Sequence, residues 1–349
     1  MRLLIINPGS TSTKVAIFED GKQTAAETLR HATELISQFP TVYDQLEFRT
    51  AAVTAFLVSC GNPALDGVVG RGGLLPPMPS GVYEVDDALV DKLRHPMGQH
   101  ASNLGGLIAR NIAKERGLRA FIADSVTTDE LAPLARYSGH PIIPRISIFH
   151  ALNQKSVARR AASDMGRRYE EVNFIVCHLG GGVSVGAHKA GMVVDVANAL
   201  DGEGPFAPER AGTLPITGLI ELCYSGRYTH AEARKLLTGG GGFVAHLGTN
   251  SGQKLSEMVD AGDEHAILIE KAFVYGVAKE VGRMAAVLEG RVDAILITGG
   301  LAYSARICSL IEERVSPLAK VLRYPGEDEM MALAEAGARA LGKASTKSV

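Results

Sequence analysis

A strand–turn–strand pattern that occurs twice is the sequence feature that most constrains the fold. The apolar run Leu3–Ile6 leads into the turn Asn7–Ser10 and then into a second run, Thr11–Phe18. The run Phe174–Cys177 likewise leads into a glycine turn and a second run, Val183–His188. Short β-branched runs separated by glycine turns are typical of β-hairpins. We therefore predict that one supersecondary unit is used twice, about half a chain length apart.

A second pair of segments supports a duplication. The segment Asp66–Leu74 aligns without a gap with Asp293–Leu301, and the aspartate, both glycines and the leucine coincide. Because the two matched pairs occur in the same order, they indicate two homologous halves. An apolar run followed by Gly-Gly is also common in unrelated proteins with alternating strands and helices, so a chance match is the alternative.

Helical periodicity between the predicted strands sets the fold class. Apolar residues recur every three or four positions in several stretches. The predicted helices are Asn103–Lys114, Ser147–Arg168, Glu264–Leu288 and Glu329–Leu341. With 349 residues, 46% of them hydrophobic, the chain can bury more than one core. Strands and helices alternate throughout, so we predict the α/β class.

Charge and composition argue against several classes of partner. Lys plus Arg number 36 and Asp plus Glu 38, a net charge of −2, whereas a nucleic-acid partner demands a basic surface. No apolar run approaches the ~18 residues that span a bilayer, and the four apolar residues before Asn7 are too few for a signal-peptide core. The four cysteines are scattered, which fits a reducing compartment. We expect a cytoplasmic protein with neither nucleic-acid nor membrane partners.

The first predicted hairpin turn carries candidate phosphate ligands. Ser10, Ser12 and neighbouring threonines supply hydroxyls, freed backbone N–H groups can cradle phosphate oxygens, and Lys14 adds a positive charge. The alternative is a plain hairpin with solvated hydroxyls. The second copy has glycines at Gly180–Gly182 in place of these hydroxyls, and glycine lets a backbone approach a ligand closely. Two such turns could clamp a polyphosphate.

Six motifs together resemble the acetate kinase family, part of the sugar kinase, Hsp70 and actin superfamily. They are Asn7–Lys14, Gly70–Leu74, His100–Gly105, Ser147–Lys155, His178–Gly182 and Asp201–Arg210. The resemblance covers essentially the whole chain, to Glu329, and is to members that phosphorylate butanoate. It implies two duplicated actin-like (ribonuclease H-like) domains around an interdomain ATP cleft. We expect the first at residues 1–150, completed by a C-terminal helix at 330–349, and the second at 151–329.

The resemblance implies a reversible reaction in which ATP and butanoate give ADP and butanoyl phosphate by direct in-line transfer, with ATP and Mg²⁺ as cofactors. A carboxylate is ionised at neutral pH, so it needs no general base. Phosphoryl transfer depends mostly on positioning and electrostatics.

One alternative is a kinase for another short or branched-chain acid, such as acetate, propionate or isobutyrate. Another is an ATP-driven switch of the actin or Hsp70 type. The family also implies a homodimer or a higher homo-oligomer.

Four residues match the family's catalytic motifs. Arg71 and Arg210 are implied to hold the carboxylate and the moving phosphoryl group, because the guanidinium fork suits both. His150 is implied to hydrogen-bond the equatorial oxygens in the transition state. Asp124 matches the active-site aspartate, and we expect it to organise magnesium and its waters. The plain alternatives are structural salt bridges for the arginines, a core histidine, and a turn cap for Asp124.

Further residues are implied to hold the nucleotide and the metal. The expected ATP ligands are Ser10, Ser12, Lys14, His178, Gly180, Gly181, Gly182, Gly299, Gly300 and Leu301. Asn7 and Glu329 are implied to complete the surroundings of the metal, directly or through water. Glu329 could instead serve only as favourable charge at the start of its helix.

The chain departs from the family pattern at three places. Acetate kinases carry Asn where Gly181 stands, and many relatives carry Asp-x-Arg where this chain has Ser251–Gln253, which puts that nucleotide contact in doubt. Acetate-specific relatives have a bulkier residue in place of Gly73. We expect Gly73 to leave room for a propyl tail lying against Phe149. Each extra buried CH₂ contributes about 0.8 kcal/mol, so preference among acids should be graded.

Overall fold

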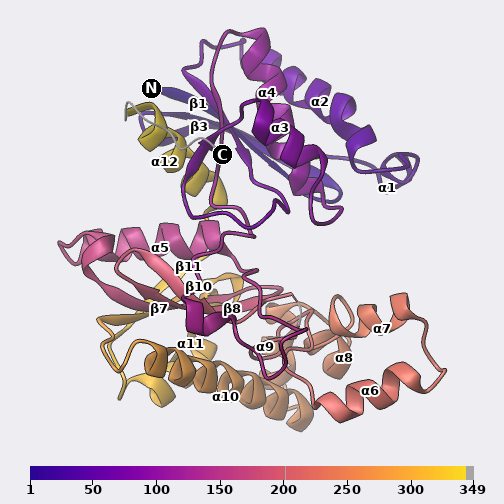
Figure 1. The fold of residues 1–349 in the computed structure, drawn as a ribbon, viewed down its shortest axis with the longest axis vertical. Coiled ribbons are helices and arrows are strands. Elements are labelled where there is room, and N and C mark those ends of the chain that lie inside the picture. The colour runs from indigo at the N-terminus through magenta and orange to yellow at the C-terminus, as the bar shows by residue number, and fades with distance from the viewer. Residues whose placement is uncertain (201, 343–349) are drawn as a thin grey trace. The chain divides into compact units, whose positions relative to one another are not determined.

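The computed structural model describes residues 1–200 and 202–342 and divides the chain into two compact units (Figure 1). The first unit comprises Met1–Thr128 and the chain from Asp328 onward, and the second comprises Asp129–Glu327. Each unit has its own sheet.

The first unit is built on a six-stranded sheet with the order β3-β2-β1-β4-β6-β5. Its strands are β1 (Arg2–Pro8), β2 (Ser12–Glu19), β3 (Lys22–Arg30), β4 (Gly67–Arg71), β5 (Val82–Glu84) and β6 (Ala120–Ala123). Strands β1, β2 and β3 pair antiparallel, whereas β4 lies parallel to both β1 and β6. The carboxyl ends of β1, β4 and β6 therefore meet at one edge of the sheet, where an α/β fold binds its ligands.

Helices cover both faces of this sheet. The helices of the first unit are α1 (Thr33–Ile36), α2 (Leu46–Ser59), α3 (Asp87–Arg94), α4 (Leu104–Glu115) and α12 (Glu329–Gly342). Leu4 and Ile6 of β1 point into a core shared with α2 and α4. On the other face α12 packs closely, since a Cβ on Gly337 would lie 2.5 Å from Val69. The last helix thus belongs to the first unit (Figure 1), and residues 343–349 of the predicted 330–349 segment lie outside the described residues.

The second unit repeats this arrangement in a five-stranded sheet with the order β11-β10-β7-β8-β9. Its strands are β7 (Asn173–Leu179), β8 (Val183–Lys189), β9 (Met192–Val196), β10 (Ala294–Gly299) and β11 (Val321–Pro325). Strands β7, β8 and β9 pair antiparallel, and β10 lies parallel to both β7 and β11. Because β6-β4-β1-β2-β3 has the same order and directions, the predicted duplication is confirmed.

Helices also cover both faces of the second sheet. The helices of the second unit are α5 (Ala151–Asp164), α6 (Ile216–Tyr224), α7 (His230–Leu237), α8 (Phe243–Leu247), α9 (Gly252–Asp260), α10 (Glu264–Val287) and α11 (Ala305–Val315). Helices α10 and α11 lie on one face and α5 lies on the other (Figure 1). The α/β class is therefore confirmed. Among the described helices, none combines the length and the apolar character that spanning a bilayer requires.

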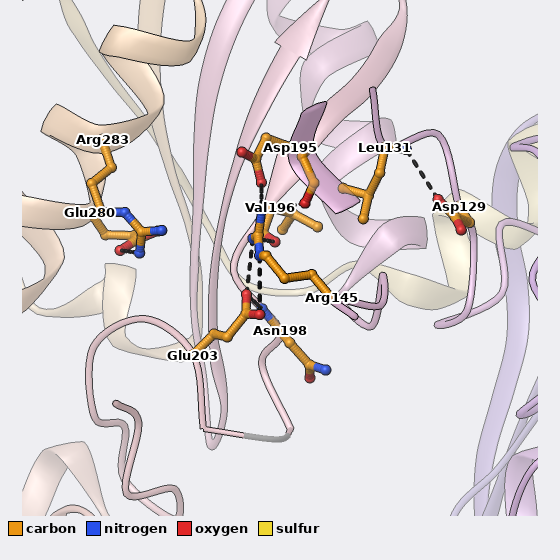
Figure 2. Close-up of polar contacts among 10 residues, drawn as sticks. Asp129, Leu131, Arg145, Asp195, Val196, Asn198, Glu203, Glu280 and Arg283 are labelled. Atoms are coloured by element: carbon orange, nitrogen blue, oxygen red, sulfur yellow. Dashed lines mark hydrogen bonds and ion pairs between the residues drawn. The ribbon is translucent and has the colours of Figure 1, made fainter. Parts of the chain in front are cut away.

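The second unit begins earlier than residue 151, because the segment from Asp129 onward packs on β9. Arg145 fastens this segment, as Figure 2 shows. Its Nη1 donates to Asp195 Oδ1 at 2.9 Å and its Nη2 donates to the Val196 carbonyl at 3.0 Å. The same guanidinium pairs with both carboxylate oxygens of Glu203, at 3.1 and 2.9 Å. An arginine whose side chain is only 14% exposed and has these partners fixes the chain that leads into α5.

Candidate active site

The turn between β1 and β2, which was predicted to bind phosphate, is hydrogen-bonded to Arg49, a fully buried residue of α2. Arg49 donates hydrogen bonds to the carbonyls of Gly9 at 2.9 Å, Ser12 at 3.0 Å and Ser10 at 2.8 Å. Burial lowers the pKa of Arg49 to about 10, so it stays protonated at neutral pH. The turn carbonyls thus face the protein, while Ser10 and Lys14 are exposed. Sequence analysis missed Arg49, whose only signal is an arginine among the apolar residues of a helix.

Three predicted residues of the first unit meet at the carboxyl ends of β1 and β4. Asn7 lies on β1 and Arg71 ends the neighbouring parallel strand β4. Glu329 begins α12, and its carboxylate forms an ion pair with Arg71. The same carboxylate accepts a hydrogen bond from Asn7 Nδ2 at 2.7 Å. Arg71, predicted to bind the substrate, and Asn7 and Glu329, predicted to bind the metal, therefore form one cluster with an ion pair at its centre.

Asp124 lies at the end of β6, in the same row of strand ends. Its Oδ1 accepts hydrogen bonds from Ser80 Oγ at 2.6 Å and from the Gly81 N–H at 3.0 Å. The side chain is buried, and the backbone adopts a φ of 35°, which is uncommon outside glycine. Strained backbone of this kind concentrates at functional sites. The plain alternative, a cap of the following turn, does not account for the contact with Gly81, which lies 43 residues earlier in the chain.

Two predicted histidines of the second unit stack on each other. The rings of His150 and His178 are nearly parallel, with centroids 3.7 Å apart. His150 Nδ1 lies 2.8 Å from Ser184 Oγ, and His178 Nδ1 lies 2.7 Å from Asn153 Oδ1. The Nε2 atom of His178 is buried, has no hydrogen-bond partner within the described part of the chain, and lies 3.6 Å from Glu327 Oε1. A buried polar atom without a partner is costly, so a ligand there would stabilise it.

The glycine turn between β7 and β8 lies directly over these rings. A Cβ on Gly180 would lie 2.9 Å from His178 Nε2, and a Cβ on Gly182 would lie 3.5 Å from His150 Cε1. The turn therefore needs glycine at position 180 so that the His178 ring fits beneath the backbone. The sequence predicted that glycine here lets the backbone approach a ligand closely. In the structure the backbone of Gly180 closely approaches the His178 ring.

A cavity of about 460 Å³ adjoins this turn within the second unit, a size typical of small-molecule sites. Its lining residues are Gly180, Gly181, Pro208, Asn250, Gly252, Gln253, Ser256, Gly300, Leu301, Tyr303, Ser304 and Glu327. Four of these were predicted as ATP ligands. Asn250, Gln253 and Ser256, which bring amide and hydroxyl groups, were not, and only Gln253 lies in the segment Ser251–Gln253 noted as departing from the family pattern. The structure places Asn250 and the first turns of α9 in the cavity wall.

Two predicted residues lie beside this cavity without lining it. Gly299 ends β10 with a φ of 90°, and a Cβ there would lie 2.4 Å from the Leu179 carbonyl. Arg210 Nη1 donates to the Glu209 carbonyl at 3.2 Å, and Arg210 Nε is buried with no hydrogen-bond partner among the residues described. Asn250 of the cavity wall donates to Glu209 Oε1 at 2.5 Å. The Arg210 loop is thereby tied to the wall of the cavity.

The room that we expected at Gly73 is filled. A Cβ at this position would lie 2.3 Å from Asn103 Oδ1, which accepts a hydrogen bond from the Leu74 N–H at 2.8 Å. The Phe149 side chain is only 2% exposed and packs in a core cluster with Leu131 and Val196. Asn103 therefore occupies the space that a side chain at position 73 would need, and the placement of the acyl tail beside Gly73 and Phe149 stays a prediction.

Comparison with known proteins places the chain in a family. The model of the Acetokinase family matches residues 135–345. The chain is 51% identical over 343 residues, 97% of both chains, to Butyrate kinase 1 of Clostridium acetobutylicum, and 50% identical over the same share to a probable butyrate kinase of Clostridium botulinum. In fold it resembles the acetate kinase of Porphyromonas gingivalis, with a TM-score of 0.78 at 20% identity over 97% of this chain and 99% of that one. On this evidence the chain belongs to the Acetokinase family.

Proposed function

We propose that this protein transfers the γ-phosphoryl group of ATP directly to the carboxylate of butanoate, giving ADP and butanoyl phosphate in a reversible reaction. The observation that carries the proposal is the 51% identity, over 97% of both chains, to a protein named Butyrate kinase 1. The clustering of Asn7, Arg71 and Glu329 and the stacking of His150 on His178 support it. Both clusters bring together residues to which the family resemblance assigns roles in this chemistry.

The second unit offers a site for the nucleotide. The 460 Å³ cavity has a wall of glycine, amide and hydroxyl groups that suits an adenosine moiety. The phosphates would follow the glycine turn at Gly180–Gly182 through its backbone N–H groups, beside His178, whose buried Nε2 would need a proton of its own to donate to them. In the first unit, the turn braced by Arg49 would hold phosphate oxygens through Ser10, Ser12 and Lys14.

The acid needs charge neutralisation and alignment rather than deprotonation, because butanoate is already an anion at neutral pH. Arg71 and Arg210 would hold its carboxylate and the transferred phosphoryl group with their guanidinium forks. His150 would donate a hydrogen bond to the equatorial oxygens as their charge develops. Because the carboxylate oxygen attacks phosphorus directly and ADP departs, no covalent intermediate on the protein is required.

Magnesium fits the donor set of the first unit. Mg²⁺ prefers oxygen ligands, keeps several waters, and commonly uses one or two carboxylates together with substrate phosphates. The Glu329 carboxylate beside Asn7 supplies such ligands, and Asp124 lies at the end of a nearby strand. Within the described residues there is no group of three His, Cys, Asp or Glu side chains placed to hold a metal, which suits an ion that arrives with the nucleotide. When bound, the ion would neutralise phosphate charge.

Two further proposals accompany this function. The four cysteines are unpaired, which supports a reducing compartment such as the cytoplasm. The family resemblance supports a homo-oligomer, and size-exclusion chromatography with light scattering would measure its mass.

The proposed function is tested by supplying the protein with ATP, Mg²⁺ and a panel of unbranched and branched acids of two to five carbons, and trapping the acyl phosphate with hydroxylamine. We expect butanoate to give the highest kcat/KM, with neighbouring chain lengths within about tenfold for each CH₂. A maximum at acetate or at a branched acid would support the alternative substrates. Hydroxamate formation with none of the acids would refute the proposal.

A further inference from the structure

A chain of buried hydrogen bonds leads away from His150 into the second unit. Ser184, Gln154 and His188 have no exposed surface, and Tyr169 is almost fully buried. Ser184 Oγ lies 2.8 Å from His150 Nδ1 and 2.8 Å from Gln154 Nε2. Gln154 Oε1 lies 2.9 Å from His188 Nε2, and His188 Nδ1 lies 2.7 Å from the Tyr169 hydroxyl. Every link has ordinary hydrogen-bond length.

Chemistry fixes the direction of the inner links. The Ser184 backbone carbonyl can only accept, and it lies 3.0 Å from the Gln154 amide, so the amide presents its Nε2 to Ser184. Gln154 Oε1 therefore faces His188, and because this oxygen can only accept, His188 Nε2 carries a proton. Burial and the nearby charges of Lys155 and Arg159 hold the pKa of His188 well below its ordinary value. His188 is thus neutral, and its Nδ1 accepts from the Tyr169 hydroxyl.

The same reasoning fixes the outer link at His150. Ser184 Oγ already accepts a hydrogen bond from Gln154 Nε2, and its single proton needs an acceptor of its own. The described residues offer that proton one acceptor, His150 Nδ1 at 2.8 Å. In the reverse arrangement, with the proton on His150 Nδ1, the buried Ser184 hydroxyl proton would have no acceptor, which costs free energy. Ser184 therefore donates, and the proton of the neutral His150 ring resides on Nε2.

The stacked partner is fixed by a second amide. Asn153 Nδ2 donates to the Glu327 carbonyl at 2.8 Å, so Asn153 Oδ1 faces His178 and accepts from its Nδ1. Two consecutive amides at the start of α5, Asn153 and Gln154, thus set two stacked rings. The nearly parallel stacking at 3.7 Å restrains the His150 ring from rotating.

We propose that Ser184, oriented by Gln154, His188 and Tyr169, is a positioning residue that holds His150 as the neutral tautomer with its proton on Nε2. In this tautomer His150 presents a hydrogen-bond donor, and not an acceptor, to the anionic oxygens of the phosphoryl group. This inference rests on the proposed function for the role of His150, whereas the tautomer itself is a property of the protein alone.

The tautomer is measured on the intact protein with ¹⁵N-labelled histidine, by long-range ¹H–¹⁵N correlation spectra of the ring nitrogens at pH 7.5. The His150 signals are those missing from the spectrum of the His150→Gln variant. We expect the correlation pattern of a protonated Nε2 and an unprotonated Nδ1. The pattern of a protonated Nδ1 would overturn the proposal, whether or not the protein is an active kinase.

Substitution of Ser184 adds an activity readout. Ser184→Ala removes the donor to Nδ1, so we expect a mixed tautomer pattern and a kcat lowered roughly tenfold, the size of one lost hydrogen bond, with little change in KM for ATP. Ser184→Thr retains the hydroxyl and should restore both the pattern and kcat. The control is Ser59→Ala, which removes an exposed hydroxyl of α2 that donates to the Phe56 carbonyl at 2.8 Å and should leave kcat unchanged.

The tautomer spectra and the activity assays distinguish a failure of the Ser184 assignment from a failure of the proposed function. If the wild-type protein forms no acyl phosphate, the proposed function fails, and the tautomer measurement still decides the assignment of Ser184. If the wild-type protein is active, an unchanged Nε2 pattern together with wild-type kcat in Ser184→Ala refutes the positioning role alone.

Discussion

The guanidinium of Arg71 forms an ion pair with the carboxylate of Glu329, which also accepts a hydrogen bond from Asn7. The two partners lie far apart in the sequence and meet where a strand ends and the last helix begins. In the proposed reaction each has another partner, the acid and phosphoryl group for Arg71 and the metal for Glu329. Substrate and metal binding would therefore exchange this ion pair for two new charge pairs.

Arg71→Ala should lower kcat/KM for butanoate by roughly 10²-fold or more, because a charge-assisted contact to the reacting group is lost. Arg71→Lys should recover only part of this loss, since an ammonium group lacks the guanidinium fork. Hydroxamate formation measures both. Arg110→Ala, which removes a surface pair with Asp87, is the control and should retain activity. Near-wild-type turnover of Arg71→Ala would remove Arg71 from the mechanism.

Glu329→Gln should raise the Mg²⁺ concentration needed for half-maximal activity, because an amide is a weaker ligand for this ion than a carboxylate. The measurement is the initial rate over a range of Mg²⁺ at fixed ATP. Glu335→Gln changes an exposed residue of the same helix and should leave the Mg²⁺ dependence as in the wild type. An identical Mg²⁺ dependence of the Glu329 variant and the wild type would contradict a role in metal binding. Glu329 would then serve only as favourable charge at the start of its helix.

Arg49→Met should both destabilise the first unit and weaken ATP binding. The substitution leaves the carbonyls of Gly9, Ser10 and Ser12 without their buried donor, at a cost of roughly 3 kcal/mol in the free energy of unfolding. Urea unfolding measures the first effect, and KM for ATP, which should rise, measures the second. A loss of stability with unchanged KM for ATP would restrict Arg49 to a structural role.

The stability of the second unit should depend on pH through His188. Its folded pKa is held well below the ordinary value of 6.5, so below about pH 6.5 the unfolded chain binds a proton that the folded protein does not. The free energy of unfolding should therefore fall as the pH decreases from 7.5 to 5.5, by up to about 1.4 kcal/mol for each pH unit below 6.5.

Comparison with His188→Gln isolates this contribution, because a glutamine cannot titrate. The pKa of His31 is also lowered by burial and that of Glu280 is raised by burial, and these groups act equally in both proteins. Urea unfolding at the two pH values should show a smaller loss for the variant. Equal losses in variant and wild type would mean that His188 contributes nothing to the pH dependence.

The repeated hairpins and the segments around Asp66–Leu74 and Asp293–Leu301 made the duplicated α/β architecture predictable from the sequence. Local signals marked the strands that carry Asn7 and Arg71, but the parallel pairing of β1 with β4, which brings these residues to one edge of the sheet, is seen only in the structure. The residues at which helices begin and end were predicted less accurately. The predicted helix from Ser147 begins at Ala151, because Arg145 fastens the preceding segment to β9 through contacts distant in sequence.

Residues that act through burial could not be read from the sequence. Arg49 and Arg145 look like ordinary surface arginines until their backbone partners are known. The filled space at Gly73 depends on the placement of Asn103, which no local pattern specifies. The hydrogen-bond chain behind His150 joins residues of α5, β8 and the segment before β7, so only the fold brings it together.

The central claim is that the γ-phosphoryl group of ATP moves to a carboxylate oxygen of butanoate. The most direct measurement is a ³¹P NMR time course of the purified protein with ATP, Mg²⁺ and butanoate. The account predicts that the γ-phosphate signal of ATP declines while signals of ADP and an acyl phosphate grow, and that no acyl phosphate forms without butanoate. Release of inorganic phosphate at the same rate with and without butanoate, or no consumption of ATP, would contradict it.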